Sequence, residues 1–393
     1  MSAPHPLTVH PLVGIPEVVP DQDPARALAR LLRQALSEAG LALRDGDVLA
    51  VSSKLVSKAG GLTADPHDRT RVIAEESVAV LAERRIDPAD AAQITRVVRA
   101  RAGPVLAAAG VDASNTGGRD VLLLLPRDPD EVCRVLREAL TEATGVRRLG
   151  VLLTDTAGRP WRVGQTDFAL GAAGLRVLDD LRGSCDADGR PLLVTIRAVA
   201  DEIAGAADLV KGKTAGIPAV LVRGLAELVL DPREHSRGSE PAPGARALVR
   251  TGDNDWFALG AQEAVRTALG VPAGSSRAQR VGIRPTSGDT SRDRIARAIS
   301  VAADPEVSAW AADVMVDGPG DLSGGSGDRP RGSSTSRPAA GVITVTAADA
   351  FSAGMIVSRL LTALAGEELP HRVLDVHRSP SGTRVRLGPD PLT

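Results

Sequence analysis

Residues 150–167 read GVLLTDTAGRPWRVGQTD, and this stretch indicates most about the fold. An uninterrupted apolar run passes directly into polar side chains, which is typical of a buried strand that ends at a loop. Two further apolar runs, DVLAVSS at 47–53 and VLLLLP at 121–126, also predict short buried strands. Polar residues gather where such strands end, and loops at these places often carry the chemistry of a protein.

Helical patterns lie between these strands. Asp23 followed by Pro24 predicts an N-cap, and the apolar spacing after it predicts a helix that ends at Gly40. Residues 129–144 form a second amphipathic pattern, and we expect a further helix at about 69–84. Other segments predict a strand that runs into a Gly-Pro loop at 8–18, a strand continuing into a helix at 192–213, and a strand at 218–224, whereas 94–115 is ambiguous. Because no regular βαβ order emerges, we predict an α+β or irregular α/β fold.

Composition divides the chain into four predicted parts. Residues 1–265 form the predicted main domain, and 266–316 form a connecting segment that is helical in part. Residues 317–341 are a low-complexity Gly/Ser/Pro linker, for which we expect disorder. Residues 342–393 form a small α/β segment with a strand, a helix and one hairpin, and the sequence does not indicate its role.

Charge and composition exclude several classes of function. The 393 residues carry a formal net charge of −2, from 47 basic and 49 acidic residues. This balance gives no reason to expect nucleic acid or an anionic membrane as a partner. Two cysteines without CxxC spacing predict neither a zinc site nor a disulfide framework. Without a long apolar run or a leader-like start, we expect a soluble cytoplasmic protein.

The segment VSSKLVSKAGG at 51–61 is the first polar cluster with a chemical interpretation. We expect its residues after the strand to form a polar loop. Hydroxyls, backbone N–H groups and lysines in one such loop suit a polyphosphate, although the Walker A pattern is absent. Taken alone, the segment is more commonly explained as a solvated loop with two lysines.

Two more clusters, AAGVDASN at 108–115 and residues 154–167, supply oxygen ligands. Asp112 and Asp155, supported by Thr156 and by Asp167, fit a divalent cation that is also bound to phosphates. Two nearby arginines, Arg159 and Arg162, could clamp an anionic substrate. The structural alternative is that the Asp and Thr residues cap helices or form turns.

The segment VADEIAGAADLVKGK at 199–213 leaves two interpretations open. Asp201 and Glu202 could cap a helix or complete a metal site. Lys211 and Lys213, which flank Gly212, could complement the helix dipole or contact a nucleotide.

Taken in order, GIPEV, SSKLVSK, AAGVDASN, TDTAGRPWRVGQTD and VADEIAGAADLVKGK resemble the coenzyme F420-0:gamma-glutamyl ligase family. The resemblance spans roughly residues 8–265 and includes the N-terminal half of the two-domain actinobacterial form. It implies an acid–amino-acid ligase of the EC 6.3.2 type that uses GTP and two divalent cations, Mg2+ or Mn2+. The substrates would be coenzyme F420-0 and L-glutamate, further glutamates would follow through γ-linkages, and the protein would form a homodimer.

The resemblance also assigns roles to single residues. Asp112 and Asp155 would bind one metal ion and Thr156 the second. The implied GTP contacts are Ile15, Pro16, Glu17, Val18, Ser53, Lys58, Asn115, Lys211, Gly212 and Lys213.

The chemistry that the resemblance implies needs activation of a carboxylate, because oxide is a poor leaving group. Phosphoryl transfer from GTP would give an acyl phosphate, which the amine of glutamate then attacks. After about residue 270 the chain is shorter than the two-domain form, which carries a flavin domain there, so we expect no flavin. Two alternatives remain: an inactive nucleotide-binding relative that acts as a scaffold, and a bifunctional ligase and flavin reductase.

Overall fold

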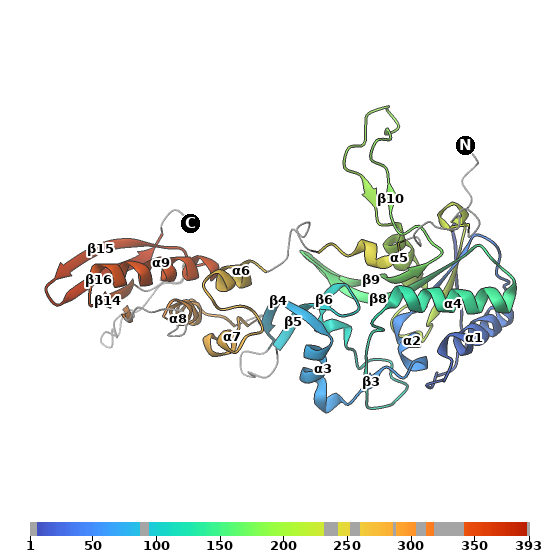
Figure 1. Ribbon diagram of the computed structural model, residues 1–393, viewed down its shortest axis with the longest axis horizontal. Coiled ribbons are helices and arrows are strands. Elements are labelled where there is room, and N and C mark those ends of the chain that lie inside the picture. Colours follow the sequence, from blue (N-terminus) through green and yellow to red (C-terminus); the bar gives the residue numbers. More distant parts are fainter. Residues whose placement is uncertain are drawn as a thin grey trace, which may run out of the picture. The chain divides into compact units, whose positions relative to one another are not determined.

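The computed structural model describes residues 6–86, 94–231, 243–251, 260–285, 288–303, 312–317 and 342–390. The chain divides into two compact units (Figure 1). Unit 1 comprises Met1–Ala79 and Val97–Asp255, and unit 2 comprises Val80–Arg96 and Trp256–Thr393. Helices and several separate sheets occur together, which confirms the predicted α+β class. Within the described ranges, no helix has the length and apolar character needed to cross a membrane.

Unit 1 is built on a five-stranded sheet with the order β1-β12-β2-β8-β9. Its strands are β1 (Thr8–Pro11), β12 (Ala219–Arg223), β2 (Asp47–Ser52), β8 (Leu149–Arg159) and β9 (Arg162–Ala173). Only the central pair β2 and β8 is parallel, and the other neighbours are antiparallel. A single parallel pair in a mixed sheet agrees with the expectation that the fold is not doubly wound.

Helices cover the two faces of this sheet. Val48 and Ala50 of β2 pack in one core with residues of α5 (Val199–Lys211). Side chains alternate along a strand, so Leu49 and Val51 point to the other face and are also fully buried. On that side α4 (Pro129–Thr144) packs against β8 and β9, and α1 (Pro24–Glu38) packs against α4. Burial on both faces explains why the central strands are continuous apolar runs.

The predicted limits of the two long helices are confirmed. Asp23 caps α1 by accepting a hydrogen bond from the backbone N–H of Arg26 at 3.1 Å. Asp128 caps α4 in the same way, through the N–H of Glu131 at 3.2 Å. Gly145 follows α4 with a φ of +76°, a left-handed conformation that suits glycine at a helix end.

Two secondary-structure predictions are wrong. The predicted polar loop after β2 is a helix, α2 (Ser53–Ala59), because Leu55, Val56 and Ala59 form a short buried stripe despite the interleaved lysines. The predicted helix at 69–84 ends at Glu75 as α3 (Arg69–Glu75) and continues as the strand β4 (Ser77–Arg85). β-branched valines in β4 favour a strand, and β4 pairs with one neighbour at the edge of a small sheet.

That small sheet has the order β4-β5-β6 and resolves the ambiguous segment 94–115. Its other strands are β5 (Ile94–Ala100) and β6 (Val105–Ala107), and the boundary between the units crosses β4 and β5. The remaining short elements of unit 1 are β3 (Thr63–Ala64), β7 (Leu122–Leu123), β10 (Asp179–Asp180), β11 (Ile196–Arg197), and the 3-10 turns η1 (Pro66–Asp68), η2 (Ala108–Gly110), η3 (Ala226–Leu228) and η4 (Ala245–Leu248).

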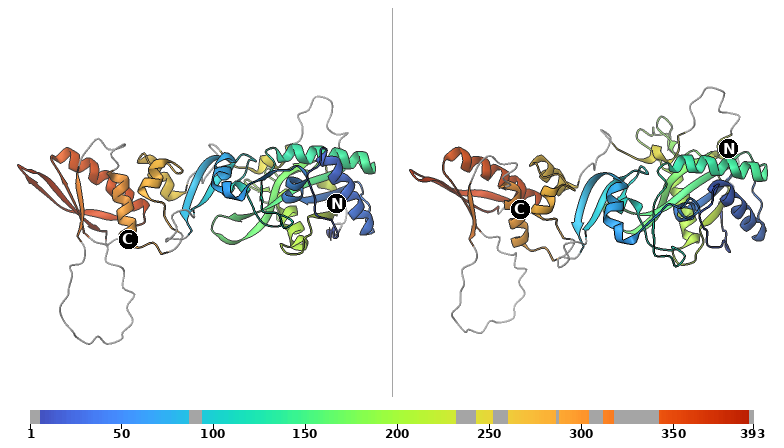
Figure 2. Two further views of the ribbon diagram at one scale, coloured as in Figure 1. Left: turned by 90° about the horizontal axis from the view of Figure 1, so that it is seen from below. Right: turned by 60° about the horizontal axis from the view of Figure 1, so that its bottom comes forward.

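Among its described residues, unit 2 has an antiparallel sheet with the order β13-β14-β16-β15 (Figure 2) and the helices α6 to α9. The strands are β13 (Asp313–Asp317), β14 (Val342–Ala347), β15 (His371–Ser379) and β16 (Gly382–Pro389). The helices are α6 (Ala261–Ala268), α7 (Ser276–Val281), α8 (Ser291–Ala302) and α9 (Ala350–Gly366). The predicted strand, helix and hairpin after residue 342 are therefore confirmed, with β15 and β16 as the hairpin.

One core joins parts of unit 2 that the sequence separates. Val271 and Ile295, from the predicted connecting segment, are buried together with Val345 and Leu360 from the predicted C-terminal segment. Residues 318–341 of the predicted low-complexity linker lie outside the described residues. The boundaries at 265, 316 and 341 therefore stay predictions.

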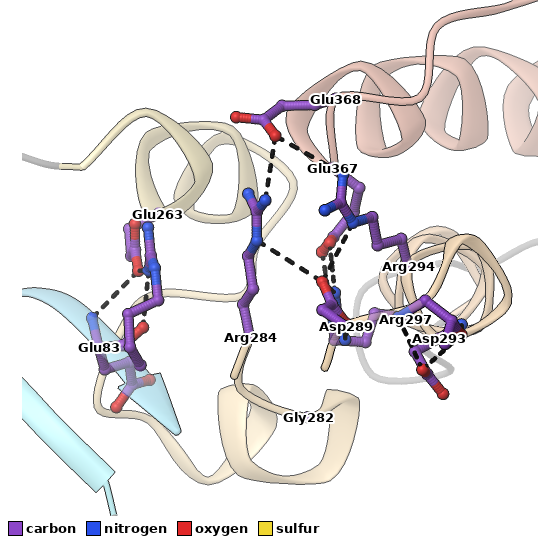
Figure 3. A network of polar contacts seen from close by, with 12 residues as sticks. Glu83, Glu263, Gly282, Arg284, Asp289, Asp293, Arg294, Arg297, Glu367 and Glu368 are labelled. Carbon is purple, nitrogen blue, oxygen red and sulfur yellow. Dashed lines mark hydrogen bonds and ion pairs between the residues drawn. The ribbon is translucent and has the colours of Figure 1, made fainter. Parts of the chain in front are cut away.

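A buried ionic network connects α6, α8 and the C-terminal end of α9 (Figure 3). The side chain of Glu367 is 2% exposed and accepts hydrogen bonds from Arg266 and Arg297, each at 2.8 Å. Asp289 also binds Arg297, at 2.7 Å, and Arg294, at 3.2 Å. Burying ions has a large desolvation cost, so removing one partner from such a network leaves an uncompensated charge.

Two adjacent glutamates test the importance of this burial. Glu367→Gln should destabilise unit 2 by about 3 kcal/mol, because two buried arginines lose their shared carboxylate. Glu368→Gln is the matched control: the Glu368 side chain is 68% exposed and pairs only near the surface, so its loss should cost less than about 1 kcal/mol. Amide hydrogen exchange of α8 and α9 in the full chain measures both effects. Equal protection in the two variants would contradict the prediction.

Candidate functional site

The parallel pairing of β2 with β8 ends where Ser52 lies opposite Thr154; β2 passes into α2 there, and β8 continues to Arg159 in its hairpin with β9. A cavity of about 290 Å³ opens where this pairing ends. It is lined by most of the residues that the sequence marked as candidates: Ile15, Pro16, Glu17, Val18, Lys58, Asn115, Asp155, Thr156, Lys211, Gly212 and Lys213. Five segments that are far apart in the sequence therefore meet at one place.

Four predicted site residues do not line this cavity. Ser53 is buried beneath it, and its hydroxyl donates to Asp155 Oδ1 at 3.0 Å. Asp112 lies behind Lys54, with which it forms an ion pair. Arg159 and Arg162 are exposed on either side of the turn that joins β8 to β9.

Helix α2 presents two lysines to the cavity. Lys54 and Lys58 are four residues apart, so they lie on the same face of the helix. Lys54 Nζ lies 2.5 Å from Asp112 Oδ2 and also donates to the hydroxyl of Ser114. Lys58 Nζ lies 2.7 Å from Glu17 Oε2. The predicted nucleotide contacts omit Lys54, and its i,i+4 spacing from Lys58 is the signal that could have identified it.

The ion pair with Lys54 alters the acidity of Asp112. Partial burial would raise the pKa of the Asp112 carboxyl, but the hydrogen bond from Lys54, together with those from Ser114, outweighs it. The pKa is lowered to about 2. Asp112 is therefore ionised at neutral pH, with both of its oxygens already accepting hydrogen bonds.

Asp155 shows the opposite behaviour. Burial within β8, next to the last residue that pairs with β2, raises its pKa to about 6, although hydrogen bonds from the Ser53 hydroxyl and the Thr156 backbone act against this shift. The nearby carboxylate of Asp167 raises the pKa further. A buried carboxylate that is costly to ionise becomes a strong ligand when a cation can compensate its charge.

Next to Asp155, four residues form a closed polar cluster. Lys211 Nζ donates to Thr154 Oγ1 at 2.6 Å and to Asp167 Oδ2. Asp167 Oδ1 accepts a hydrogen bond from Thr156 Oγ1 at 2.7 Å. The side chains of Lys211 and Asp167 are 6% and 4% exposed. This pair is therefore a buried ion pair, not a surface one.

The structure also distinguishes between acidic residues of α5. Asp201 Oδ1 accepts a hydrogen bond from the backbone N–H of Ala169 at 2.8 Å, and it does not line the cavity. Glu202 pairs with Arg197 at 2.7 Å, where both side chains are exposed. Asp208, which the sequence interpretation missed, does line the cavity. Burial and the proximity of Asp167 raise the pKa of Asp208.

The oxygen donors of the cavity fit a divalent cation only when a bound nucleotide supplies further oxygen ligands. Over the described part of the chain, no three His, Cys, Asp or Glu side chains are grouped so that they could hold a metal ion. Asp155 and Thr156 face the same cavity, and Mg2+-type ions commonly take one or two protein oxygens together with phosphates and waters. These residues therefore fit a nucleotide-bound cation better than a site made by protein alone.

Comparison with known sequences places this α+β domain and its cavity among the ligases. Residues 13–224 match the family described as F420-0:Gamma-glutamyl ligase. The chain belongs to that family, which confirms the resemblance predicted from the motifs.

Several archaeal relatives carry the name coenzyme F420:L-glutamate ligase. The chain is 39% identical over 235 residues to the relative from Haloarcula marismortui, covering 55% of this chain and 87% of that protein. It is 38% identical over 246 residues to the relative from Methanopyrus kandleri, covering 60% and 92%. For Natronomonas pharaonis the identity is 40% over 228 residues, covering 53% and 83%.

The raised pKa of Asp155 predicts that Asp155→Asn changes the free energy of unfolding by an amount that depends on pH, when a chelator is present. Because the folded pKa of about 6 exceeds the ordinary value of 3.8, the folded protein holds this proton more tightly than the unfolded chain. The wild type therefore loses stability as the pH rises from about 4 to 6. Asparagine does not ionise, so the variant should be more stable by about 3 kcal/mol at pH 8 and by less than about 1 kcal/mol at pH 4.

Urea unfolding of both proteins at these two pH values measures the difference in the free energy of unfolding. If this difference in unfolding free energy does not change with pH, burial of the ionised Asp155 carboxylate is not the cause of the difference.

Proposed function

We propose that the protein joins L-glutamate to the coenzyme F420 precursor F420-0 and then adds further γ-linked glutamates, with GTP as the energy source. The observation that carries this proposal is the family match, which spans the cavity-lining segments from Ile15 to Pro218. The names of the relatives give the same reaction class. On the basis of the family resemblance, the proposal also includes assembly as a homodimer and a cytoplasmic location.

The proposed nucleotide site is the lysine-lined part of the cavity. Lys54, Lys58 and Lys213 bring positive charge to it from α2 and from the end of α5. Asn115 has a left-handed φ of +55°, and its Nδ2 lies 3.5 Å from the carbonyl oxygen of Lys213. This contact brings two of the proposed GTP-binding segments together. Triphosphate oxygens are the ligands that such ammonium and amide groups recognise.

The proposed metal ligands are Asp112, Asp155 and Thr156, for Mg2+ or Mn2+. Bound cations would neutralise charge on the triphosphate during transfer. Asp155 and Thr156 already face the cavity, whereas Asp112 would first have to exchange Lys54 for the cation. Lys54, once released, would be free to contact a phosphate oxygen.

The proposed reaction has two steps. The acceptor carboxylate attacks the γ-phosphorus of GTP, and GDP leaves with the electrons of the broken P–O bond. The deprotonated amine of glutamate then attacks the acyl phosphate, and inorganic phosphate leaves as the amide forms. The contribution of this chain is to hold the triphosphate in line with the acceptor and to exclude water from the acyl phosphate.

A single incubation tests the proposal. The full chain is mixed with F420-0, L-glutamate, GTP and Mn2+, and the products are followed by mass spectrometry. Successive glutamate-sized mass increases are expected, and they should stop when GTP is omitted. Asp155→Ala should lower turnover by at least about 100-fold with the fold intact, because a charge-stabilising group is lost. Near wild-type turnover of this variant, or no addition by the folded wild type, would reject the proposal.

A second experiment tests the proposed anion clamp. Arg159 and Arg162 are exposed at the end of the β8–β9 hairpin, so they could reach only a substrate that extends beyond the cavity. If they grip an acceptor carboxylate or phosphate, replacing both by alanine should raise KM for F420-0 about 10-fold or more and leave GTP affinity unchanged. The exposed Arg182, which pairs with Asp180, provides the control substitution. Equal kinetics in the two variants would exclude a clamp.

A further inference from the structure

Lys211 is a cavity residue whose ammonium group is directed into the protein. Its side chain is 6% exposed, and Nζ donates to Thr154 Oγ1 at 2.6 Å and to Asp167 Oδ2. Thr154 is completely buried. Lys213, two residues further on, lies beyond the end of α5 and is exposed. The two lysines that flank Gly212 therefore occupy different environments and need not share one role.

Asp167 connects Lys211 with Thr156. It lies opposite Thr156 in the pairing of β9 with β8, and its Oδ1 accepts a hydrogen bond from Thr156 Oγ1 at 2.7 Å. Its Oδ2 accepts from Lys211. Both oxygens are therefore engaged, and the side chain is only 4% exposed. Asp167 also lines the cavity, with its two oxygens accepting hydrogen bonds from Thr156 and Lys211.

The hydrogen bond to Asp167 fixes the direction of the Thr156 hydroxyl. A hydroxyl has one proton and two lone pairs, and here the proton is given to the carboxylate. The lone pairs are therefore directed away from Asp167, and Thr156 lines the cavity. An oxygen whose proton is held elsewhere is available to accept a cation. Lys211 supports this arrangement because its ammonium group forms a buried ion pair with the Asp167 carboxylate.

We propose that Asp167 and Lys211 are positioning residues that hold the Thr156 hydroxyl as an oxygen ligand for the nucleotide-bound divalent cation. Lys211 acts through Asp167 and does not contact the phosphates, whereas Lys213 does. This inference rests on the proposed function, because it assumes a cation in the cavity. It gives Lys211 a role different from the GTP contact that the family resemblance implies.

Mn2+ binding in the presence of GTP, with no acceptor present, tests the inference without turnover. Electron paramagnetic resonance of free Mn2+ gives the dissociation constant. Thr156→Val should raise it about 10- to 100-fold, as is typical when the environment of a metal ligand is lost. Thr156→Ser, which keeps the hydroxyl, should bind nearly as the wild type does.

A matched pair of double variants tests whether Thr156 needs a hydrogen-bond acceptor at position 167. Asp167→Leu/Lys211→Met removes both charges and leaves Thr156 without a partner, whereas Asp167→Asn/Lys211→Met keeps an amide oxygen that can accept its proton. Both variants avoid an uncompensated buried charge, so both are expected to fold, which circular dichroism verifies. The leucine variant should lose Mn2+ affinity about 10- to 100-fold, and the asparagine variant should retain most of it.

GTP binding in the presence of a chelator separates the two lysines. Lys213→Met should weaken this metal-free binding, and Asp167→Asn/Lys211→Met should not. Weakening by both would show that Lys211 contacts the nucleotide, which overturns the inference. Unchanged Mn2+ affinity in Thr156→Val and in the leucine variant would overturn it as well. A folded wild type that binds no Mn2+ with GTP would instead reject the metal part of the proposed function, and the inference with it.

Discussion

The parallel pairing of β2 with β8 is the constraint on which the rest of unit 1 depends. β2 and the residues of β8 that pair with it, 149–154, are almost all buried on both faces, so core packing fixes their register. This register places the last residue of β2, Ser52, opposite Thr154. The first residue of α2, Ser53, can then donate to Asp155. Packing of apolar residues in the middle of the sheet thus determines where α2, with its lysines, lies relative to the carboxylates of β8 and β9.

The sequence predicted the long elements well, because their signals are local. Capped amphipathic helices and apolar strands need no knowledge of distant residues. The prediction failed for α2 and β4, where short elements take their form from the neighbours against which they pack. At the site, the sequence identified most of the cavity-lining residues. It missed Asp208 and the importance of Lys54, and it could not show that Lys211 faces inward. Each of these facts depends on a partner far along the chain: Lys54 is 58 residues from Asp112, and Lys211 is 44 residues from Asp167.

In unit 2, even more depends on contacts between residues far apart in the sequence, which the sequence alone does not reveal. Its core is assembled from segments that a low-complexity stretch separates in the sequence, and its helices are joined by ion pairs among buried arginines and acids. Charged residues usually indicate a surface, so a pattern such as SRDRIARAIS suggests exposure on its polar side. In the structure Arg297 of that pattern is 8% exposed. Only the arrangement of its partners shows that these charges belong to an interior.

The insertion of residues 80–96 into unit 2 has a consequence for how the chain is made. The backbone N–H of Glu83 donates to Glu263 at 3.0 Å, across 180 residues, and that of Gly260 donates to the carbonyl oxygen of Leu81, also at 3.0 Å. During synthesis on the ribosome, β4 therefore emerges long before the residues that complete its surroundings. The chain passes between the units more than once, so a cut near residue 255 would not separate two finished bodies. It would leave β4, an early-made strand, without the late-made segment with which it forms hydrogen bonds.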